Sequence, residues 1–279
     1  MKELKEKFSY ENDGHVFKSY DWDNSDGWKD ELSNKLIPLI QNLYADLESL
    51  KKDLEETGWD EKEIKKHIDE VLNASIPSDT TDSKIENFQV RRADFAELIA
   101  TICLEELYNT KIPLNNILHR ELTHKSGRGI DIFGYEEVGN NICLILCEIK
   151  GSKDSNSPPS VVGDSEDSMK QQLFSYVTDK KKTLDRIINI RKKSTNINDK
   201  KTLTKISMLW TKEDESPLKV IACPFLVRDG NCYKNTDFGF FKENPDHFAP
   251  AKIRFLIVCI HDDIVELSKQ IYNLARESA

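Results

Sequence analysis

The sequence predicts an α/β protein in which a central mixed β-sheet is flanked by helices and preceded by a helical N-terminal region. Short apolar runs at residues 142–150, 218–227 and 253–260 are typical of buried strands, because polar or turn-forming residues bound each run. Segments 28–56 and 168–193 instead carry apolar residues at intervals of three and four, which indicates amphipathic helices. Strands that alternate with helices in this way favour the α/β class.

A chain of 279 residues can form one large domain, or a domain with an appendage. Charge divides it unevenly: residues 1–80 hold 11 lysines and 20 acidic residues, and so carry the whole net charge of −9. We therefore expect an acidic helical region over residues 1–80 and a second domain over residues 83–279, with a linker at 75–82. A well-solvated helical surface is the simpler explanation of the same acidic excess.

Composition also narrows the cellular setting. No apolar run approaches the ~20 residues that a membrane helix needs, and the first 14 residues lack the apolar stretch of a secretory signal. The six cysteines form no Cys-x-x-Cys pair. We expect a cytoplasmic protein with reduced thiols, no zinc site and no membrane partner.

The N-terminal helices follow from leucine spacing. Residues 1–27 are polar with scattered aromatic residues, and the helix at 28–56 carries a leucine stripe that we expect to bend at Pro38. A second helix over 60–73 would complete a helical hairpin. Its apolar stripe needs a partner surface.

Glu97 lies in a helix predicted over residues 91–108. Between Phe95 and Leu104 the sequence is apolar except at Glu97 and Thr101, which lie on one side of the helix. An acid near a helix N-terminus is favoured by the helix dipole, which is the structural explanation. The apolar surroundings favour a functional role instead.

A β-hairpin brings together the residues with the clearest chemistry. The segment 129–134 and the apolar run 142–150 are joined through Gly139-Asn140-Asn141, a pattern typical of a hairpin. Glu148 and Lys150 point to the same face of their strand, and Asp131 lies in the preceding one. Two carboxylates at the end of a buried sheet are costly unless they bind something, and a divalent metal is the usual ligand.

The remaining elements are assigned in order. We expect a strand over 117–122, then a turn over 124–129 that could place Lys125 or Arg128 beside a phosphate. The Ser-, Pro- and Asp-rich segment 151–167 is predicted to be a mobile loop. Asp262 is predicted to cap a final helix that ends near Ala275.

The chain has one strongly basic segment, residues 179–205, with ten basic and three acidic residues. A solvated helix end explains it simply, because cations suit the C-terminal dipole. A track for nucleic-acid phosphates is the alternative, and the predicted metal site favours it. The candidate DNA-binding residues are Lys180, Lys181, Lys182, Arg186, Arg191, Lys192 and Lys193.

The order of these elements resembles the PD-(D/E)xK, or restriction-endonuclease-like, nuclease superfamily. The matching order is a helix with Glu97, a strand, a strand with Asp131, a strand ending in Glu148-x-Lys150, a helix and a strand. Gln172-x-x-x-Tyr176 in the following helix is similar to an element of RecB-like members. One departure is Ile130, which stands where the superfamily's name has proline.

Within that superfamily, three segments resemble the HamA-type nuclease subunits of Hachiman anti-phage systems, over roughly residues 85–279. These segments are RRADFAELIA, GIDIFG and IRFLIVCIHDD. The resemblance implies a restriction-endonuclease-like core, Mg²⁺- or Mn²⁺-dependent cleavage of DNA, and a helicase or ATPase partner subunit.

In this interpretation each candidate catalytic residue has a role. Asp131 and Glu148 would hold the metal, Lys150 would stabilise developing negative charge, and Glu97 would hold a second metal or its water. Gln172 and Tyr176 would orient Lys150 or the phosphate.

Two other functions stay open: a DNA-repair or restriction nuclease, and a non-catalytic DNA-binding or assembly subunit with the same fold. DNA versus RNA, endo- versus exonuclease action, strand preference, activation trigger, oligomeric state and partner surface stay open too.

Overall fold

The chain forms two compact units, each described here by itself from a computed structural model. The structure describes residues 4–22, 27–77, 85–114, 129–139, 141–163, 167–212 and 218–277, with the side chains of 85–92 excepted. One unit comprises Met1–Asp23, Ala100–Leu114 and Arg128–His261. The other comprises Asn24–Ile99, Asn115–Gly127 and Asp262–Ala279.

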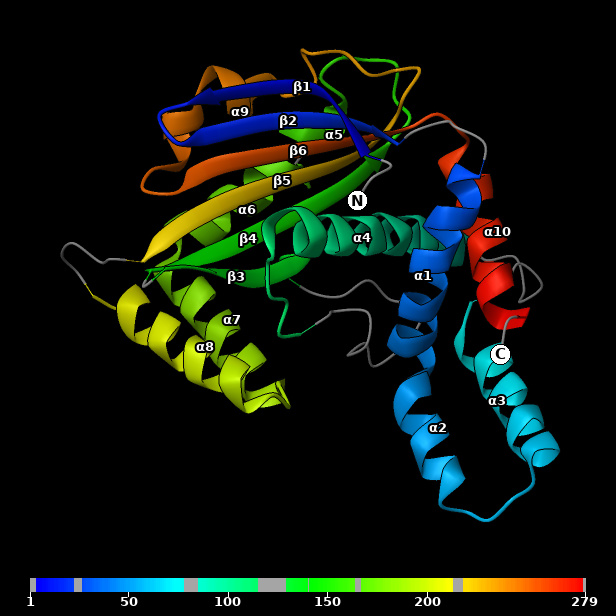
Figure 1. Ribbon diagram of the computed structural model, residues 1–279. Coiled ribbons are helices and arrows are strands. Elements are labelled where there is room, and N and C mark those ends of the chain that lie inside the picture. The colour runs from blue at the N-terminus through cyan, green and yellow to red at the C-terminus, as the bar shows by residue number, and fades with distance from the viewer. Residues whose placement is uncertain are drawn as a thin grey trace. The chain divides into compact units, whose positions relative to one another are not determined.

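The first unit is built on a six-stranded sheet of order β1-β2-β6-β5-β4-β3 (Figure 1). Its strands are β1 (Leu4–Asn12), β2 (His15–Trp22), β3 (Ile132–Val138), β4 (Asn141–Ser152), β5 (Lys219–Asp229) and β6 (Lys252–Ile260). The two outer pairs, β1–β2 and β3–β4, are antiparallel, whereas β2, β6, β5 and β4 run parallel to one another. The predicted α/β class with a mixed sheet is therefore confirmed.

Residues 4–22 differ from the helical region expected over residues 1–80, because they form two strands of the sheet. Asp13 and Gly14 both have positive φ, of 48° and 78°, as a tight two-residue hairpin turn requires. Phe17, Tyr20 and Trp22 of β2 are buried. Burial of these aromatic side chains gives the hairpin its place beside β6.

The other strands lie close to their predicted positions. β3 and β4 form the predicted hairpin, with Ile132 opposite Cys147, and β5 and β6 correspond to the runs at 218–227 and 253–260. The strand predicted over 117–122, and with it Lys125 and Arg128, lies outside the described residues.

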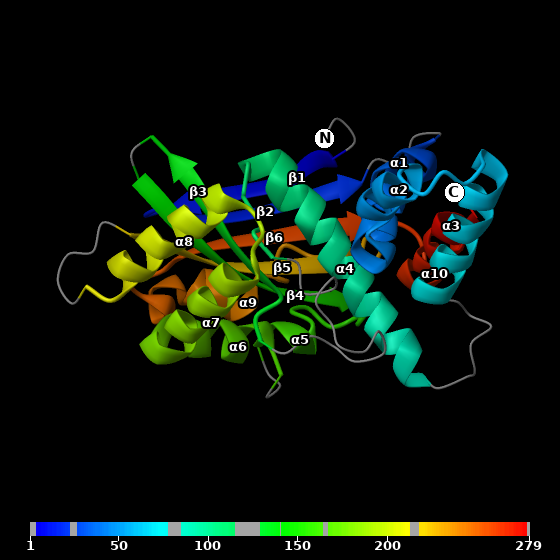
Figure 2. The same ribbon diagram turned by 90° about the horizontal axis from the view of Figure 1, so that it is seen from below.

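One face of the sheet packs against helices from the same unit (Figure 2). They are α5 (Ser160–Gly163), α6 (Met169–Thr178), α7 (Lys180–Lys193), α8 (Ile197–Trp210), α9 (Gly239–Glu243) and the 3₁₀ helix η1 (Pro245–Phe248). The single helix predicted over 168–193 is two helices, because Asp179 ends α6 and its carboxylate accepts the backbone N–H of Lys182 to cap α7.

The segment predicted as a mobile loop, 151–167, is tied down over its described part by Arg228. The guanidinium of this fully buried residue donates to the carbonyl oxygens of Asp154 (2.5 Å) and Asn156 (2.8 Å). Its charge is balanced by Asp237, with Nε 2.9 Å from Oδ2. Backbone carbonyls of this segment therefore serve as ligands for a buried cation.

The second unit is helical, with α1 (Trp28–Ala45), α2 (Leu47–Glu55), α3 (Glu61–Ser75), α10 (Ile264–Glu277) and most of α4 (Ile85–Tyr108). The helix predicted over 28–56 breaks at Asp46, which has φ of 47°, and Pro38 lies inside α1. A capping box from Asp60 and Glu63 starts α3. Asp263 caps α10, whereas the predicted cap, Asp262, pairs with Lys29.

Among the helices in the described ranges, none combines the length and the apolar character needed to cross a membrane.

Candidate functional site

The β3–β4 hairpin brings Asp131, Glu148 and Lys150 together, as the sequence predicted. Asp131 directly precedes β3, and the pairing of Ile132 with Cys147 places it beside Glu148. The backbone N–H of Ile149 donates to Asp131 Oδ2 at 2.7 Å, which fixes the Asp131 carboxylate on β4 between the other two side chains. Period-2 alternation puts Glu148 and Lys150 on the same face of β4.

Glu148 is only 4% exposed, and its two oxygens have different surroundings. Oε1 lies 3.0 Å from Lys150 Nζ, whereas Oε2 is buried and has no hydrogen-bond partner among the residues that the structure describes. Burial, and next the negative charge of Asp131, raise the pKa of the Glu148 carboxyl well above its usual range. Although burial opposes it, the charge of Glu148 raises the pKa of Lys150.

A second buried acid on the hairpin, Glu136, has hydrogen-bond partners for both of its carboxylate oxygens. Arg254 donates to both of its oxygens, at 2.5 Å and 3.0 Å, and Thr110 Oγ1 donates to Oε1 at 2.7 Å. Glu136 is thus neutralised within the protein, whereas Glu148 keeps an unpaired buried oxygen beside another carboxylate. Such an oxygen is costly to bury, which is expected where a ligand is to be bound.

Gln172 reaches the site through Asp167, a residue that the sequence interpretation missed. Gln172 Nε2 donates to Asp167 Oδ1 at 3.0 Å, and Asp167 Oδ2 lies 3.5 Å from Lys150 Nζ. Gln172 was predicted to orient Lys150 or the phosphate, and in the structure its link to Lys150 is indirect. No sequence motif identifies Asp167, because it lies at the end of a loop that contains several acidic residues and nothing in the sequence distinguishes it from them.

Tyr176 contacts the start of β3, whereas the sequence prediction placed it against Lys150 or the phosphate. Its hydroxyl accepts the backbone N–H of Ile130 at 3.1 Å, one residue before Asp131. Gly129 has φ of +106°, and a Cβ there would lie 2.8 Å from the Tyr176 hydroxyl oxygen. Tyr176 and Gly129 together therefore set the position from which Asp131 approaches β4.

We expect Tyr176→Phe and Gly129→Ala to lower activity through Asp131. Tyr176→Phe leaves a buried N–H unsatisfied, at a cost of about 1–3 kcal/mol, and Gly129→Ala adds strain and a close contact. Both should raise the metal concentration needed for half-maximal cleavage, a readout that simple loss of folded protein would not change. Thr178→Ala, at the end of the same helix, is the control, because the Thr178 hydroxyl is exposed and donates to the backbone carbonyl of Phe174 within that helix. An unchanged metal titration in both variants would contradict this role.

Glu97 lies in the part of α4 that belongs to the second unit, so its predicted role at the metal stays a prediction. It is buried, as are Asp94 and Thr101 on the same helix. The Tyr44 hydroxyl donates to Asp94 Oδ2 at 2.5 Å, which ties α4 to α1. Buried polar groups on this helix therefore include at least one with a structural role.

The seven candidate DNA-binding residues all lie on α7, but in different surroundings. Lys182 Nζ lies 4.1 Å from the centre of the Tyr176 ring and donates to Ser175 Oγ at 2.7 Å. Arg186 lies beside Gly129, with Cζ 3.9 Å from the position a Cβ would take there. Arg191 is bound to Thr204 Oγ1 on α8, at 2.7 Å. Lys182 therefore lies against Tyr176, and Arg186 lies beside Gly129, just before the start of β3.

The residues present fit a hard divalent cation. The described residues include no group of three or more His, Cys, Asp or Glu side chains placed to hold a metal. Mg²⁺ does not require one, because it is commonly bound by one or two carboxylates together with waters and substrate phosphate. Asp131, and Glu148 with its unpaired Oε2, supply such a pair.

The chain matches no protein-family model and no curated protein.

Proposed function

We propose that this protein is a metal-dependent nuclease that hydrolyses phosphodiester bonds in DNA. The proposal is supported chiefly by Glu148, whose buried Oε2 has no partner among the described residues, while Lys150 contacts Oε1 and the charge of Asp131 acts on the same carboxyl group. A buried carboxylate beside a half-buried one, with an adjacent ammonium group, suits the binding of a cation and a phosphate.

In this mechanism Asp131 and Glu148 would hold Mg²⁺ or Mn²⁺. When bound, the metal would lower the pKa of a water molecule and polarise the phosphate. The Lys150 ammonium group offsets negative charge that develops on the phosphate oxygens, and it also orients the attacking water. Asp167 contacts Lys150 and accepts a hydrogen bond from Gln172, and Tyr176 holds the backbone before Asp131. Glu97 would hold a second metal or a metal-bound water.

DNA as the substrate, a helicase or ATPase partner and a role in anti-phage defence are parts of the proposal that rest on the resemblance to HamA-type subunits. A DNA-repair or restriction nuclease would use the same chemistry. A non-catalytic DNA-binding or assembly subunit is the alternative from another class. The complete set of Asp131, Glu148 and Lys150 argues against it, because a site that has lost its activity usually lacks one of the three.

The deciding experiment is to incubate the purified full chain with supercoiled plasmid, linear duplex and single strands. We expect cleavage with Mg²⁺ or Mn²⁺ and none with EDTA. Cleavage that persists in EDTA, or no cleavage of any substrate with either metal, would contradict the proposal. Comparing the substrates also separates endonuclease from exonuclease action.

If α7 contacts the DNA backbone, reversing Lys181, Lys182 and Arg186 to Glu should weaken binding at every sequence. The slope of log affinity against log salt should become shallower by about 1 for each phosphate that the protein no longer neutralises. Binding is measured in EDTA by fluorescence anisotropy, which separates it from cleavage. The control reverses Lys51, Lys52 and Lys62, exposed lysines of α2 and α3, with the same change in net charge. Equal slopes for the two triple variants would mean that the α7 charges only solvate the helix.

A further inference from the structure

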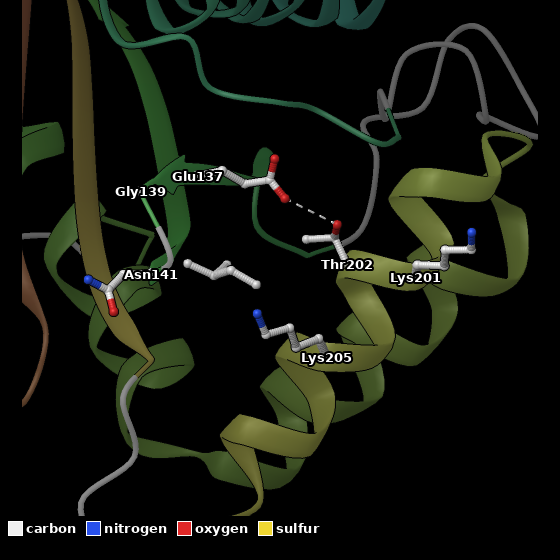
Figure 3. Close-up of a pocket in the computed structure, with 7 residues that line it drawn as sticks. Glu137, Gly139, Asn141, Lys201, Thr202 and Lys205 are labelled. Carbon is white, nitrogen blue, oxygen red and sulfur yellow. Dashed lines mark hydrogen bonds between the residues drawn. The ribbon is translucent and has the colours of Figure 1, made fainter.

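A pocket of about 550 Å³ lies between the tip of the β3–β4 hairpin and helix α8 (Figure 3). It is separate from the site at the other end of β4. Its described lining combines hairpin residues with one face of α8: Glu137, Gly139, Asn141, Ile142, Lys201, Thr202 and Lys205.

The pocket lining carries more positive than negative charge. Lys205 extends from α8 toward β4, whereas the side chain of Lys201, one turn earlier, points away from the hairpin (Figure 3). Neither ammonium group forms an ion pair with a residue that the structure describes. Glu137 faces α8 and accepts from Thr202 Oγ1 at 3.5 Å. Two lysines against one partnered acid leave the described lining with a net positive charge.

The position of the lysines on α8 weakens the usual structural explanation. Cations in the last turn of a helix are stabilised by its dipole, which accounts for Lys192 and Lys193 at the end of α7. Lys201 and Lys205 instead lie in the middle of α8, between Ile197 and Trp210. The helix dipole therefore does not account for these two exposed charges.

The pocket and the candidate catalytic site lie along the same strand, β4, and on the same face of it. Ile142, Glu148 and Lys150 are separated by even numbers of residues on β4, so they point to the same side. Eight residues of strand from Ile142 to Lys150 correspond to about 26 Å. The α7–α8 pair carries basic residues at both places: Lys182 and Arg186 by the start of β3, and Lys205 at the pocket.

We propose that this pocket is a second phosphate-binding subsite, which holds a backbone phosphate of the nucleic acid about 8 base pairs from the bond that is cleaved. The spacing follows from a rise of about 3.4 Å per base pair along a duplex. The subsite rests on the proposed function, since its ligand is a distant part of the same substrate. It makes binding depend on substrate length.

The test compares duplex DNAs of about 6, 10 and 16 base pairs, at constant salt and in EDTA, by fluorescence anisotropy. The full-length wild type should bind the middle duplex more tightly than the shortest, because the substrate first spans both sites at that length. In Lys201→Gln/Lys205→Gln this increase in affinity should disappear, and the salt slope for the longest duplex should become shallower by about 1, for the one phosphate that the subsite no longer neutralises. Lys51→Gln/Lys52→Gln, with the same change in charge on α2, should keep the increase.

The outcomes separate the subsite from the nuclease proposal. If wild type cleaves DNA but its affinity does not depend on length, or if the pocket variant keeps the increase, the subsite is wrong and the function stands. If wild type shows the length dependence but cleaves nothing with Mg²⁺ or Mn²⁺, the subsite stands on a DNA-binding protein and the nuclease chemistry is wrong. If wild type binds no duplex of any length, both proposals are wrong.

Discussion

Glu148→Gln should lower the rate of DNA cleavage by about 10²-fold or more while the protein stays folded. The substitution removes a predicted metal ligand but keeps the size of the side chain. It also removes a buried charge that Asp131 disfavours, so it should not lower the thermal unfolding midpoint in EDTA. Added Mg²⁺ should raise the midpoint of the wild type and leave that of the variant unchanged, because only a folded state that binds the ion is stabilised.

Glu136→Gln on the same hairpin is the matched control. It leaves the half-buried Arg254 with a neutral partner, so it should lower the unfolding midpoint and still allow the Mg²⁺-induced rise. Lys150→Ala should reduce turnover as Glu148→Gln does. Wild-type-like cleavage by Glu148→Gln, in a preparation free of contaminating nuclease, would overturn the functional proposal as a whole.

Asp237→Ala should lower the free energy of unfolding of the first unit by about 3–5 kcal/mol, because it leaves the fully buried Arg228 charge uncompensated. Urea unfolding followed by circular dichroism gives the midpoint. Lys66→Ala breaks the exposed Lys66–Glu70 pair of α3 and should change stability by no more than about 0.5 kcal/mol. A variant at Asp237 with the wild-type midpoint would show that the carbonyl ligands alone satisfy Arg228.

The parts of the site that could be predicted are those encoded locally. Asp131, Glu148 and Lys150 follow from strand alternation and one hairpin, and these short-range rules placed them correctly beside one another. The strands at 218–227 and 253–260 were equally legible, since buried parallel strands are continuous apolar runs.

The parts that could not be predicted depend on contacts between distant segments. Nothing in the sequence around Asp167 indicates that it contacts Lys150, and nothing near Tyr176 indicates that its hydroxyl binds the backbone of Ile130. Arg228 sits in an apolar strand, and its ligands come from a loop some 70 residues earlier. Polar composition suggested that this loop was mobile, and a buried cation overrides that inference.

The strands at 4–22 are a different case, because a signal was present. Asn12-Asp13-Gly14 is a hairpin turn sequence, and aromatic residues recur along β2. The outer strand obscured it: β1 is mostly exposed, and a register shift between Glu6 and Phe8 interrupts its alternation.

The place of β2 beside β6 has a consequence for how the chain is made. Val16 pairs with Arg254, so β2 must wait for a strand that is synthesised 238 residues later. At synthesis rates of about 5–20 residues per second, that wait is on the order of tens of seconds. During it, Phe17, Tyr20 and Trp22 have no sheet to pack on. The β3–β4 hairpin emerges in the same interval. Asp131 and Glu148 are therefore synthesised before the six-stranded sheet that supports them can form.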